Sequence, residues 1–288
     1  MSKKRKYKAL SSQYLIRIMQ VFKKNQWSIE TSEDISNSLF NRYCKRILDL
    51  KENKKRDLMI ELTERYLWIP DDKYLEYLID ALIKLMTIKS EISNTTKIYI
   101  MPLISPEDKD KIKSSSMVAY LFNSVKLRYH SKLSKYKFII VDDESKLHSN
   151  LKDTDSMIIL VDDYIGTGET AEKCILHMIE QGVEKKQIGI ISLVAQKLGL
   201  DYLSKYDISI AVSVIRNKGI SDFYKDEILE TNLNLMRDIE TKMSIKDKYR
   251  LGYGKSEALV TMCRTPNNTL PLFWEESGNM NVAPFPRF

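Results

Sequence analysis

The sequence predicts an α/β fold with a mainly parallel sheet and flanking helices, plus an α-helical N-terminal region. Three observations predict it: apolar residues follow helical spacing over residues 10–90, short apolar runs of strand length follow from residue 97, and a helix-length segment separates two of those runs. Strands that alternate with helices are typical of parallel βαβ units. We therefore expect a helical region over residues 1–92 and an α/β domain over residues 93–288.

The N-terminal region is predicted to form helices with one apolar stripe each. Ser11 or Ser12 can cap the first, Pro70 ends the third, and Asp71 or Asp72 caps the fourth. These stripes are ordinary core positions, and a small helical DNA-binding module is the alternative. Their apolar members are Tyr14, Leu15, Ile18, Met19 and Phe22; Ile35, Leu39, Tyr43, Ile47 and Leu48; Leu58, Leu62 and Tyr66; and Leu75, Leu78, Ile79, Leu82 and Leu85.

Strands are predicted wherever a short apolar run appears in the second part of the chain. A helix is expected over Thr170 to Gln181, with Gly182 in the position of a C-terminal glycine. Helical spacing returns over residues 222–245, and the last forty residues are irregular. The predicted strands are Ile98 to Met101, Phe138 to Val141, Ile158 to Val161, Ile188 to Leu193 and Ile208 to Val214.

The composition is that of a folded protein. Of the 288 residues, 43% are hydrophobic and 30% are charged, while the 9 Gly and 7 Pro are too few for a disordered chain. The 3 Cys and 3 His are scattered, which argues against a disulfide framework and against a Cys-type zinc site. We expect no metal ligands among them.

The positive charge is concentrated at the N-terminus. The five cations Lys3, Lys4, Arg5, Lys6 and Lys8 account for most of the net charge of +7, and without them +2 remains. Such a tail is either a solvated terminus or an arm that touches nucleic acid or an acidic partner. The sequence shows neither the apolar core of a signal peptide nor a membrane-spanning stretch, so we expect a cytoplasmic protein.

The segment from Ile158 to Thr170 is built to bind a sugar phosphate. Four apolar residues are followed by Asp162 and Asp163, and then by a Gly/Thr turn that opens a helix. Ligands of open α/β sheets bind at the carboxyl ends of strands, and the N–H groups of a helix N-terminus bind anions. Two carboxylates beside a phosphate cradle suit a ribose 5-phosphate group, whose hydroxyls can donate to the acids. The cradle residues are Gly166, Thr167, Gly168, Glu169 and Thr170.

This segment resembles the phosphoribosyl-pyrophosphate-binding motif of type I phosphoribosyltransferases. That motif has four apolar residues, two acids, two variable residues, a small residue, Thr-Gly and Thr, and every key position matches. The resemblance implies a type I phosphoribosyltransferase fold, a glycosyltransferase reaction, and phosphoribosyl pyrophosphate bound with Mg²⁺. Asp162 and Asp163 are then the catalytic acids, and the Gly166 to Thr170 turn binds the 5′-phosphate.

Two weaker elements follow from the same resemblance. The strand ending at Pro102 leads into a loop, Leu103 to Ser116, where Lys113 and Ser114 are the best candidates to bind pyrophosphate; a solvated loop is the alternative. A C-terminal hood, residues 248–288, is expected to hold the acceptor through Asn267, Asn268 and Trp274. Its alternative is a Pro-rigid turn that packs Trp274 on the core.

The whole arrangement is similar to divergent phosphoribosyltransferases of bacterial conflict and phage-defence loci, some of which lie beside retron reverse transcriptases. Shared features are the helical N-terminal region, an altered pyrophosphate loop, and a Thr-Pro-Asn-Asn-Thr-Leu-Pro and Trp ending. The resemblance implies an antiphage effector with a reverse-transcriptase or nucleic-acid partner, and it is compatible with a homo-oligomer. The alternatives are a catalytically silent nucleotide sensor, a partner-binding regulatory subunit, and a scaffold with a vestigial pocket.

A second acid pair needs a separate interpretation. Asp142 and Asp143 also end an apolar run, as in the first strand of a response-regulator receiver. A receiver requires a later phospho-accepting Asp and a downstream Lys, and it has no use for a Thr-Gly-Glu-Thr turn. We expect this pair to be a solvated strand end or part of the segment that precedes the ribose-binding strand.

Overall fold

The computed structural model describes residues 10–32, 34, 38–93, 95–108, 113–141, 156–278, 280 and 282–287. The chain forms two compact units, which we call the sheet unit (Ile69–Asn217) and the helical unit (Met1–Trp68 with Lys218–Phe288). These units differ from the division expected at residue 92. Helix α4 packs on β5 and β6 of the sheet, and the C-terminal segment shares a core with the N-terminal helices.

The sheet unit is an α/β structure with a five-stranded, parallel sheet. Its strand order is β3-β2-β4-β5-β6, with β4 in the centre. Ile98 of β2 lies opposite Met157 of β4, and Leu160 of β4 lies opposite Ile190 of β5. All five predicted strands are confirmed: β2 (Lys97–Pro102), β3 (Lys137–Ile140), β4 (Ser156–Ile165), β5 (Ile188–Gln196) and β6 (Ser209–Arg216).

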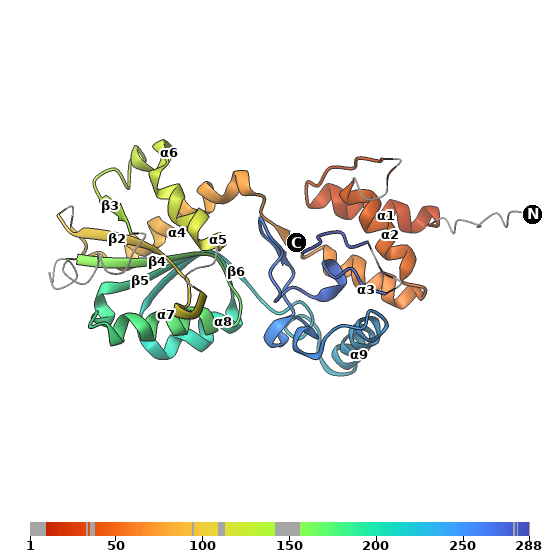
Figure 1. Ribbon diagram of the computed structural model, residues 1–288. Helices are drawn as coiled ribbons and strands as arrows, with labels where there is room; N and C mark the ends of the chain where they lie inside the picture. Colours follow the sequence, from red (N-terminus) through yellow and green to blue (C-terminus); the bar gives the residue numbers. More distant parts are fainter. Residues whose placement is uncertain are drawn as a thin grey trace, which may run out of the picture. The chain divides into compact units, whose positions relative to one another are not determined.

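Helices cover both faces of this sheet, which explains the continuous apolar runs of its central strands. On one side lie α4 (Tyr74–Ile88), α5 (Ser114–Tyr120) and the short α6 (Val125–Arg128) (Figure 1). On the other side lie α7 (Glu169–Glu180) and α8 (Lys197–Leu203) (Figure 1). Every residue of β5 is buried between these layers.

Helix α7 begins and ends at glycines. Gly168, its N-cap, has a φ of 89°, and Gly182, beyond its end, has a φ of 86°. The Gly182 N–H donates to Ile179 and the Val183 N–H donates to Met178, at 2.9 and 3.0 Å, which is the Schellman pattern. Glu169 and Glu172 place negative charge in the first turn, which stabilises the N-terminus of a helix. The helix predicted from the sequence is therefore confirmed, with its C-terminal glycine.

The helical unit contains α1 (Ser12–Lys24), α2 (Leu39–Asp49), α3 (Asn53–Thr63) and α9 (Asp226–Lys242). The predicted cap of the first helix is Ser11, whose hydroxyl accepts the Tyr14 N–H at 3.4 Å. The third helix is shorter than predicted, because the Leu67 N–H donates to the Leu259 carbonyl instead of continuing a helix. Tyr66 therefore lies outside it, and β1 (Leu67–Trp68) pairs in parallel with β7 (Val260–Thr261).

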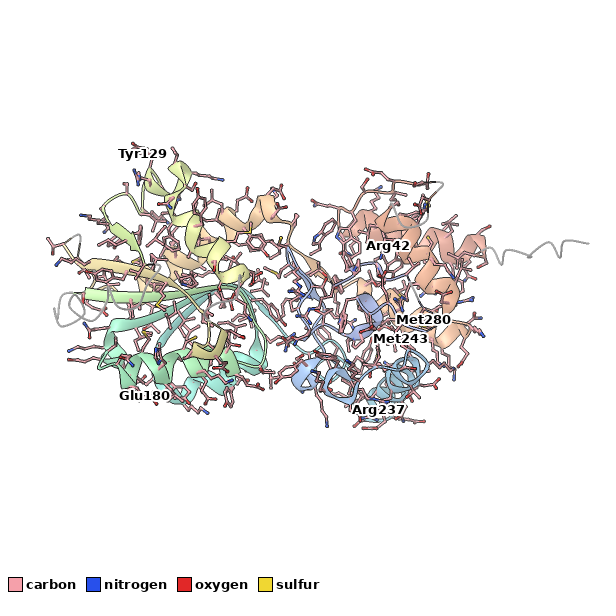
Figure 2. The ribbon with its side chains drawn as sticks, viewed as in Figure 1. Arg42, Tyr129, Glu180, Arg237, Met243 and Met280 are labelled. Atoms are coloured by element: carbon pink, nitrogen blue, oxygen red, sulfur yellow. The ribbon has the colours of Figure 1, made fainter. Side chains whose placement is uncertain are left out.

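Within the helical unit, a buried arginine joins α2 to the C-terminal segment by hydrogen bonds. Arg46 of α2 is 0% exposed; its Nε donates to the Val282 carbonyl at 3.1 Å, and its Nη2 donates to the Glu275 carbonyl at 2.5 Å. Its Nη1 lies 3.6 Å from the sulfur of Met243, which shares the core with Met280 (Figure 2). Burial lowers the pKa of the Arg46 guanidinium to about 10. Within the described ranges, the helices are too short or too polar to cross a membrane.

Candidate functional site

The acid pair lies near the carboxyl end of the central strand β4. Asp163 is 5% exposed, and both of its oxygens accept hydrogen bonds. Tyr74, the first residue of α4, donates to Oδ2 at 2.9 Å, and Ser114, the first residue of α5, donates to Oδ1 at 2.6 Å. Asp163 is thus anchored on the face that α4 and α5 cover.

Asp162 has a different environment. It is only partly buried, and its carboxyl interacts with that of Asp163. Its Oδ1 accepts the Asp163 backbone N–H at 2.9 Å. Burial and the neighbouring charge of Asp163 raise the pKa of Asp162 well above its ordinary value. A perturbed carboxyl at the carboxyl end of a strand is typical of a functional site.

The turn from Gly166 to Thr170 connects β4 to α7. Gly166 and Thr167 are partly exposed, while Glu169 and Thr170, in the first turn of α7, are exposed. The first N–H groups of a helix have no partner within it, so they can bind an anion. Gly168 holds the left-handed conformation that directs the chain from the turn into the helix. This turn offers a phosphate cradle next to the acid pair in the chain.

The two residues predicted to bind pyrophosphate each have a partner within the protein. Lys113 precedes α5, and its Nζ forms an ion pair with Asp108 Oδ2 at 2.8 Å. The Ser114 hydroxyl donates to Asp163. The structure therefore places Ser114 at the acid pair, where its hydroxyl binds Asp163. Lys109 and Lys111 of the same loop, the acids Asp142 and Asp143, and the cations of the N-terminal tail lie outside the described residues.

The predicted hood residues belong to the helical unit and not to the unit that holds the acids. Asn268 is 7% exposed and its Nδ2 donates to the Tyr253 carbonyl at 3.2 Å, while the Asn267 carbonyl accepts the Tyr253 N–H at 2.9 Å. Trp274 is 7% exposed, and its indole N–H donates to the Thr269 carbonyl at 2.7 Å. These contacts are those of the packed turn, which the sequence left as the alternative.

Two residues near the acids escaped the sequence analysis. Tyr74 looked like an ordinary helix residue, because only the tertiary fold brings its hydroxyl to Asp163. Gln196 ends β5 and is fully buried, yet among the described residues neither atom of its amide has a hydrogen-bond partner. Burial raises the pKa of the Tyr164 phenol beside it. The only sequence signal for Gln196 was that a polar residue ends an otherwise apolar strand.

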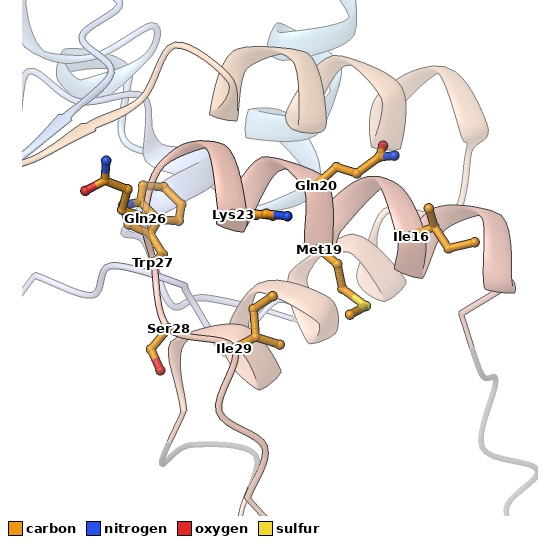
Figure 3. Close-up of a pocket in the computed structure, with 8 residues that line it drawn as sticks. All are labelled: Ile16, Met19, Gln20, Lys23, Gln26, Trp27, Ser28 and Ile29. Carbon is orange, nitrogen blue, oxygen red and sulfur yellow. The ribbon is translucent and has the colours of Figure 1, made fainter.

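The helical unit has an apolar groove of its own. It has a volume of about 710 Å³ and runs along α1 (Figure 3). Its lining includes the apolar Ile16, Met19, Trp27 and Ile29, and Lys23 is its charged member. Groups of three or more His, Cys, Asp or Glu side chains that could hold a metal are absent from the described part of the chain. The acid pair and the turn of the sheet unit thus remain the best candidate site.

Comparison with known proteins identifies the family. No curated protein matches the chain. The orotate phosphoribosyltransferase of Aeropyrum pernix, a solved structure, is 15% identical over 57% of this chain and 76% of its own, with a TM-score of 0.30, which is too slight a likeness to bear on fold or function. The PRTase-CE family model matches residues 48–287. The chain therefore belongs to the PRTase-CE family of phosphoribosyltransferase-like conflict-system effectors.

Proposed function

We propose that the sheet unit binds phosphoribosyl pyrophosphate, or the ribose 5-phosphate group of a nucleotide. The observation that carries the proposal is the junction of β4 and α7, where two acids are followed within a few residues by an anion-binding helix N-terminus. The Gly166 to Thr170 turn would hold the 5′-phosphate through its N–H groups and hydroxyls. The acids would orient the ribose, whose hydroxyls are hydrogen-bond donors.

The proposed reaction is phosphoribosyl transfer. The bond between ribose C1 and the pyrophosphate oxygen breaks, the pyrophosphate leaves with the bonding electrons, and an acceptor forms the new bond to C1. Positive charge develops on the ribose in the transition state, so a fixed carboxylate nearby stabilises it. The acceptor can be a base, a nucleic acid, a protein or water, and transfer to water would consume the cell's supply of the substrate.

The residues present fit a magnesium ion that the substrate helps to hold. Mg²⁺ is commonly bound by one or two carboxylates together with substrate phosphates and waters, and not by a cage of protein ligands. Asp162, which is partly exposed, can supply such a carboxylate. Bound there, the ion would offset the negative charge of the departing pyrophosphate. Lys113 can add to this if it leaves its ion pair with Asp108.

In the cell, we propose that the protein acts in the cytoplasm as an effector of a bacterial antiphage system such as a retron. Membership in a family of conflict-system effectors supports this role. A reverse transcriptase or nucleic acid is the expected partner, and the cations of the N-terminal tail suit the latter. Inhibition of the activity by such a partner would prevent substrate consumption before infection.

A second candidate function is a nucleotide sensor without catalysis. It is favoured by the contacts of the predicted pyrophosphate loop, in which Lys113 is bound to Asp108 and Ser114 to Asp163. A site that uses its cation and its hydroxyl internally can bind a ribose phosphate without promoting departure of pyrophosphate. Measuring binding and turnover in the same samples separates the two functions.

The test is calorimetric titration of phosphoribosyl pyrophosphate with Mg²⁺ into the wild type and the Asp162→Asn variant. We expect binding by the wild type and about tenfold or greater loss in the variant, because the amide carries no charge. Glu180→Gln is the matched control, since Glu180 is exposed at the far end of α7 (Figure 2). Pyrophosphate release would indicate an enzyme, and binding without release a sensor. A wild type that does not bind would contradict both.

A further inference from the structure

The segment that connects α5 to β3 carries an excess of positive charge. From Lys113 to Val141, all within the described chain, there are six Lys or Arg residues and no acid. The net charge of the protein is +7, of which the N-terminal tail supplies +5 and this segment +6, so the rest of the chain carries −4. The positive charge of the sheet unit is therefore concentrated in one stretch.

The cations of this stretch are open to solvent and largely without acidic partners. Lys126 lies 4.0 Å from the carboxylate of Glu76, which is a loose ion pair. The other four have no acidic partner among the described residues, and Lys135 lies over the ring of Tyr136, 4.9 Å from its centroid. The five exposed cations are Lys126, Arg128, Lys132, Lys135 and Lys137.

Large apolar side chains are exposed among these cations. Tyr120 at the end of α5 is 72% exposed, Val125 at the start of α6 is 71% exposed, and Tyr129 directly after α6 is 76% exposed. Figure 2 shows Tyr129 at the outer end of this part of the sheet unit. Exposed apolar side chains that gather in one place, surrounded by polar residues, mark an interaction surface.

The backbone that carries these side chains is held in place by buried residues. Leu127 and Leu133 are each 1% exposed, and the ring of Phe122 packs edge-on against that of Phe138 in β3 at 5.4 Å. The N–H of Arg128 donates to the Ser124 carbonyl at 3.0 Å, within α6. A surface whose backbone is already ordered loses less conformational entropy when it binds a partner.

We propose that this surface binds single-stranded nucleic acid. We call it the α6 surface and define it as Tyr120, Val125 and Tyr129 together with the five exposed cations. The cations would neutralise phosphates, and the two tyrosine rings would stack on bases, which is how proteins hold single strands without reading their sequence.

The tyrosines decide the class of partner. An acidic protein would satisfy the cations but offers no row of planar rings, and the bases of a duplex are stacked on one another. RNA and DNA strands share the chemistry that fits both features. The inference goes beyond the proposed binding of a ribose phosphate and does not depend on it; it assigns the nucleic-acid partner a surface in the folded chain, apart from the N-terminal tail.

The first experiment measures binding of the full chain to labelled single strands of about 20 nucleotides, thymidine DNA and uridine RNA, by fluorescence anisotropy. The variant Arg128→Gln/Lys132→Gln/Lys137→Gln should bind about 30-fold or more weakly at ~0.1 M salt. Its slope of log affinity against log salt should fall by about 2, because three phosphate contacts are lost.

The matched control is Lys54→Gln/Lys225→Gln/Lys246→Gln. These three lysines are exposed on the helical unit, so the net charge changes by the same amount away from the α6 surface. The control should bind within about threefold of the wild type, since only the long-range attraction is reduced. Equal losses in the two triple variants would show that net charge alone attracts the strand and would refute the α6 surface.

The second experiment tests the stacking. Tyr120→Ala and Tyr129→Ala should each weaken binding of the strand about fivefold or more, while leaving binding of polyglutamate of equal charge unchanged. Both side chains are exposed, so the fold does not depend on them. Polyglutamate that binds as tightly as the strands, with no effect of either tyrosine, would overturn the proposal in favour of an acidic protein. A wild type that binds neither DNA nor RNA would overturn it too, and would leave the ribose phosphate site to its own titration.

Discussion

At the scale of single residues, Gly199 controls how closely α8 approaches the phosphate cradle. A Cβ atom added to Gly199 would lie 2.4 Å from the carbonyl oxygen of Gly166 and 3.1 Å from the Ile165 side chain. The nearest of these atoms is backbone, which cannot rotate away as the end of a flexible side chain can. Gly199 thus allows the cradle to rest directly on the start of α8.

We predict that Gly199→Ala weakens binding of phosphoribosyl pyrophosphate about tenfold or more, because the Gly166 carbonyl and the N–H groups near it must shift. Gly182→Ala is the control: Gly182 has a φ of 86° and nothing lies within 4 Å of the added Cβ. That control should lower stability by about 1 kcal/mol without changing affinity. Equal affinities of Gly199→Ala and the wild type, measured by calorimetry, would contradict the role of this close contact.

At the scale of elements, the contact between α2 and the C-terminal segment depends on the side chain of Arg46. Arg46 brings a cation to the two carbonyls of Glu275 and Val282, which are far away in the sequence. Both hydrogen bonds are partly buried, and the planar guanidinium supplies several donors in fixed directions. This contact fastens an irregular segment that has little regular secondary structure of its own.

We predict that Arg46→Met lowers the free energy of unfolding of the helical unit by about 2–4 kcal/mol, because the carbonyls of Glu275 and Val282 lose their donor. Arg17→Met is the matched control. The Arg17 side chain is 38% exposed and pairs with Asp57 at the surface, so its loss should change stability by less than about 1 kcal/mol. Chemical denaturation of both variants distinguishes them, and equal midpoints would show that Arg46 does not anchor the segment.

At the scale of the whole molecule, a buried acid makes stability depend on pH. Glu240 of α9 is 0% exposed, and its Oε1 accepts the Leu251 N–H at 2.8 Å. Its Oε2 has no hydrogen-bond partner within the residues the structure describes. Burial raises the pKa of Glu240 to about 7, so the folded helical unit favours the neutral form.

The raised pKa of Glu240 determines the sign of the prediction. Its stabilising contribution is complete below the ordinary carboxyl pKa and is lost as the pH rises toward 7. We therefore expect Glu240→Gln to increase stability by about 1–3 kcal/mol at pH 8 and to have little effect at pH 4. Thermal unfolding across this pH range measures the difference. A variant whose melting temperature runs parallel to that of the wild type at every pH would contradict it.

The division into units shows where prediction from sequence ended at this scale. The strands and α7 were predicted within a few residues, since apolar runs and terminal glycines are local signals. The boundary expected at residue 92 differs from the units of the structure, because α4 has the same apolar spacing as the helices before it. Which core such a helix joins depends on partners that are distant in the sequence, here β5 and β6.

The sequence by itself determined the sheet, the helix that follows its central strand, and the identity of Asp162, Asp163 and the Gly166 to Thr170 turn. Each is encoded within about a dozen neighbouring residues. Only the tertiary structure decided that Asp163 is held by Tyr74 and Ser114, which lie 89 and 49 residues away, and that Asn268 and Trp274 serve the packing of the other unit. Hydrogen bonds between distant residues leave no periodicity in a sequence, because they depend on how finished elements pack.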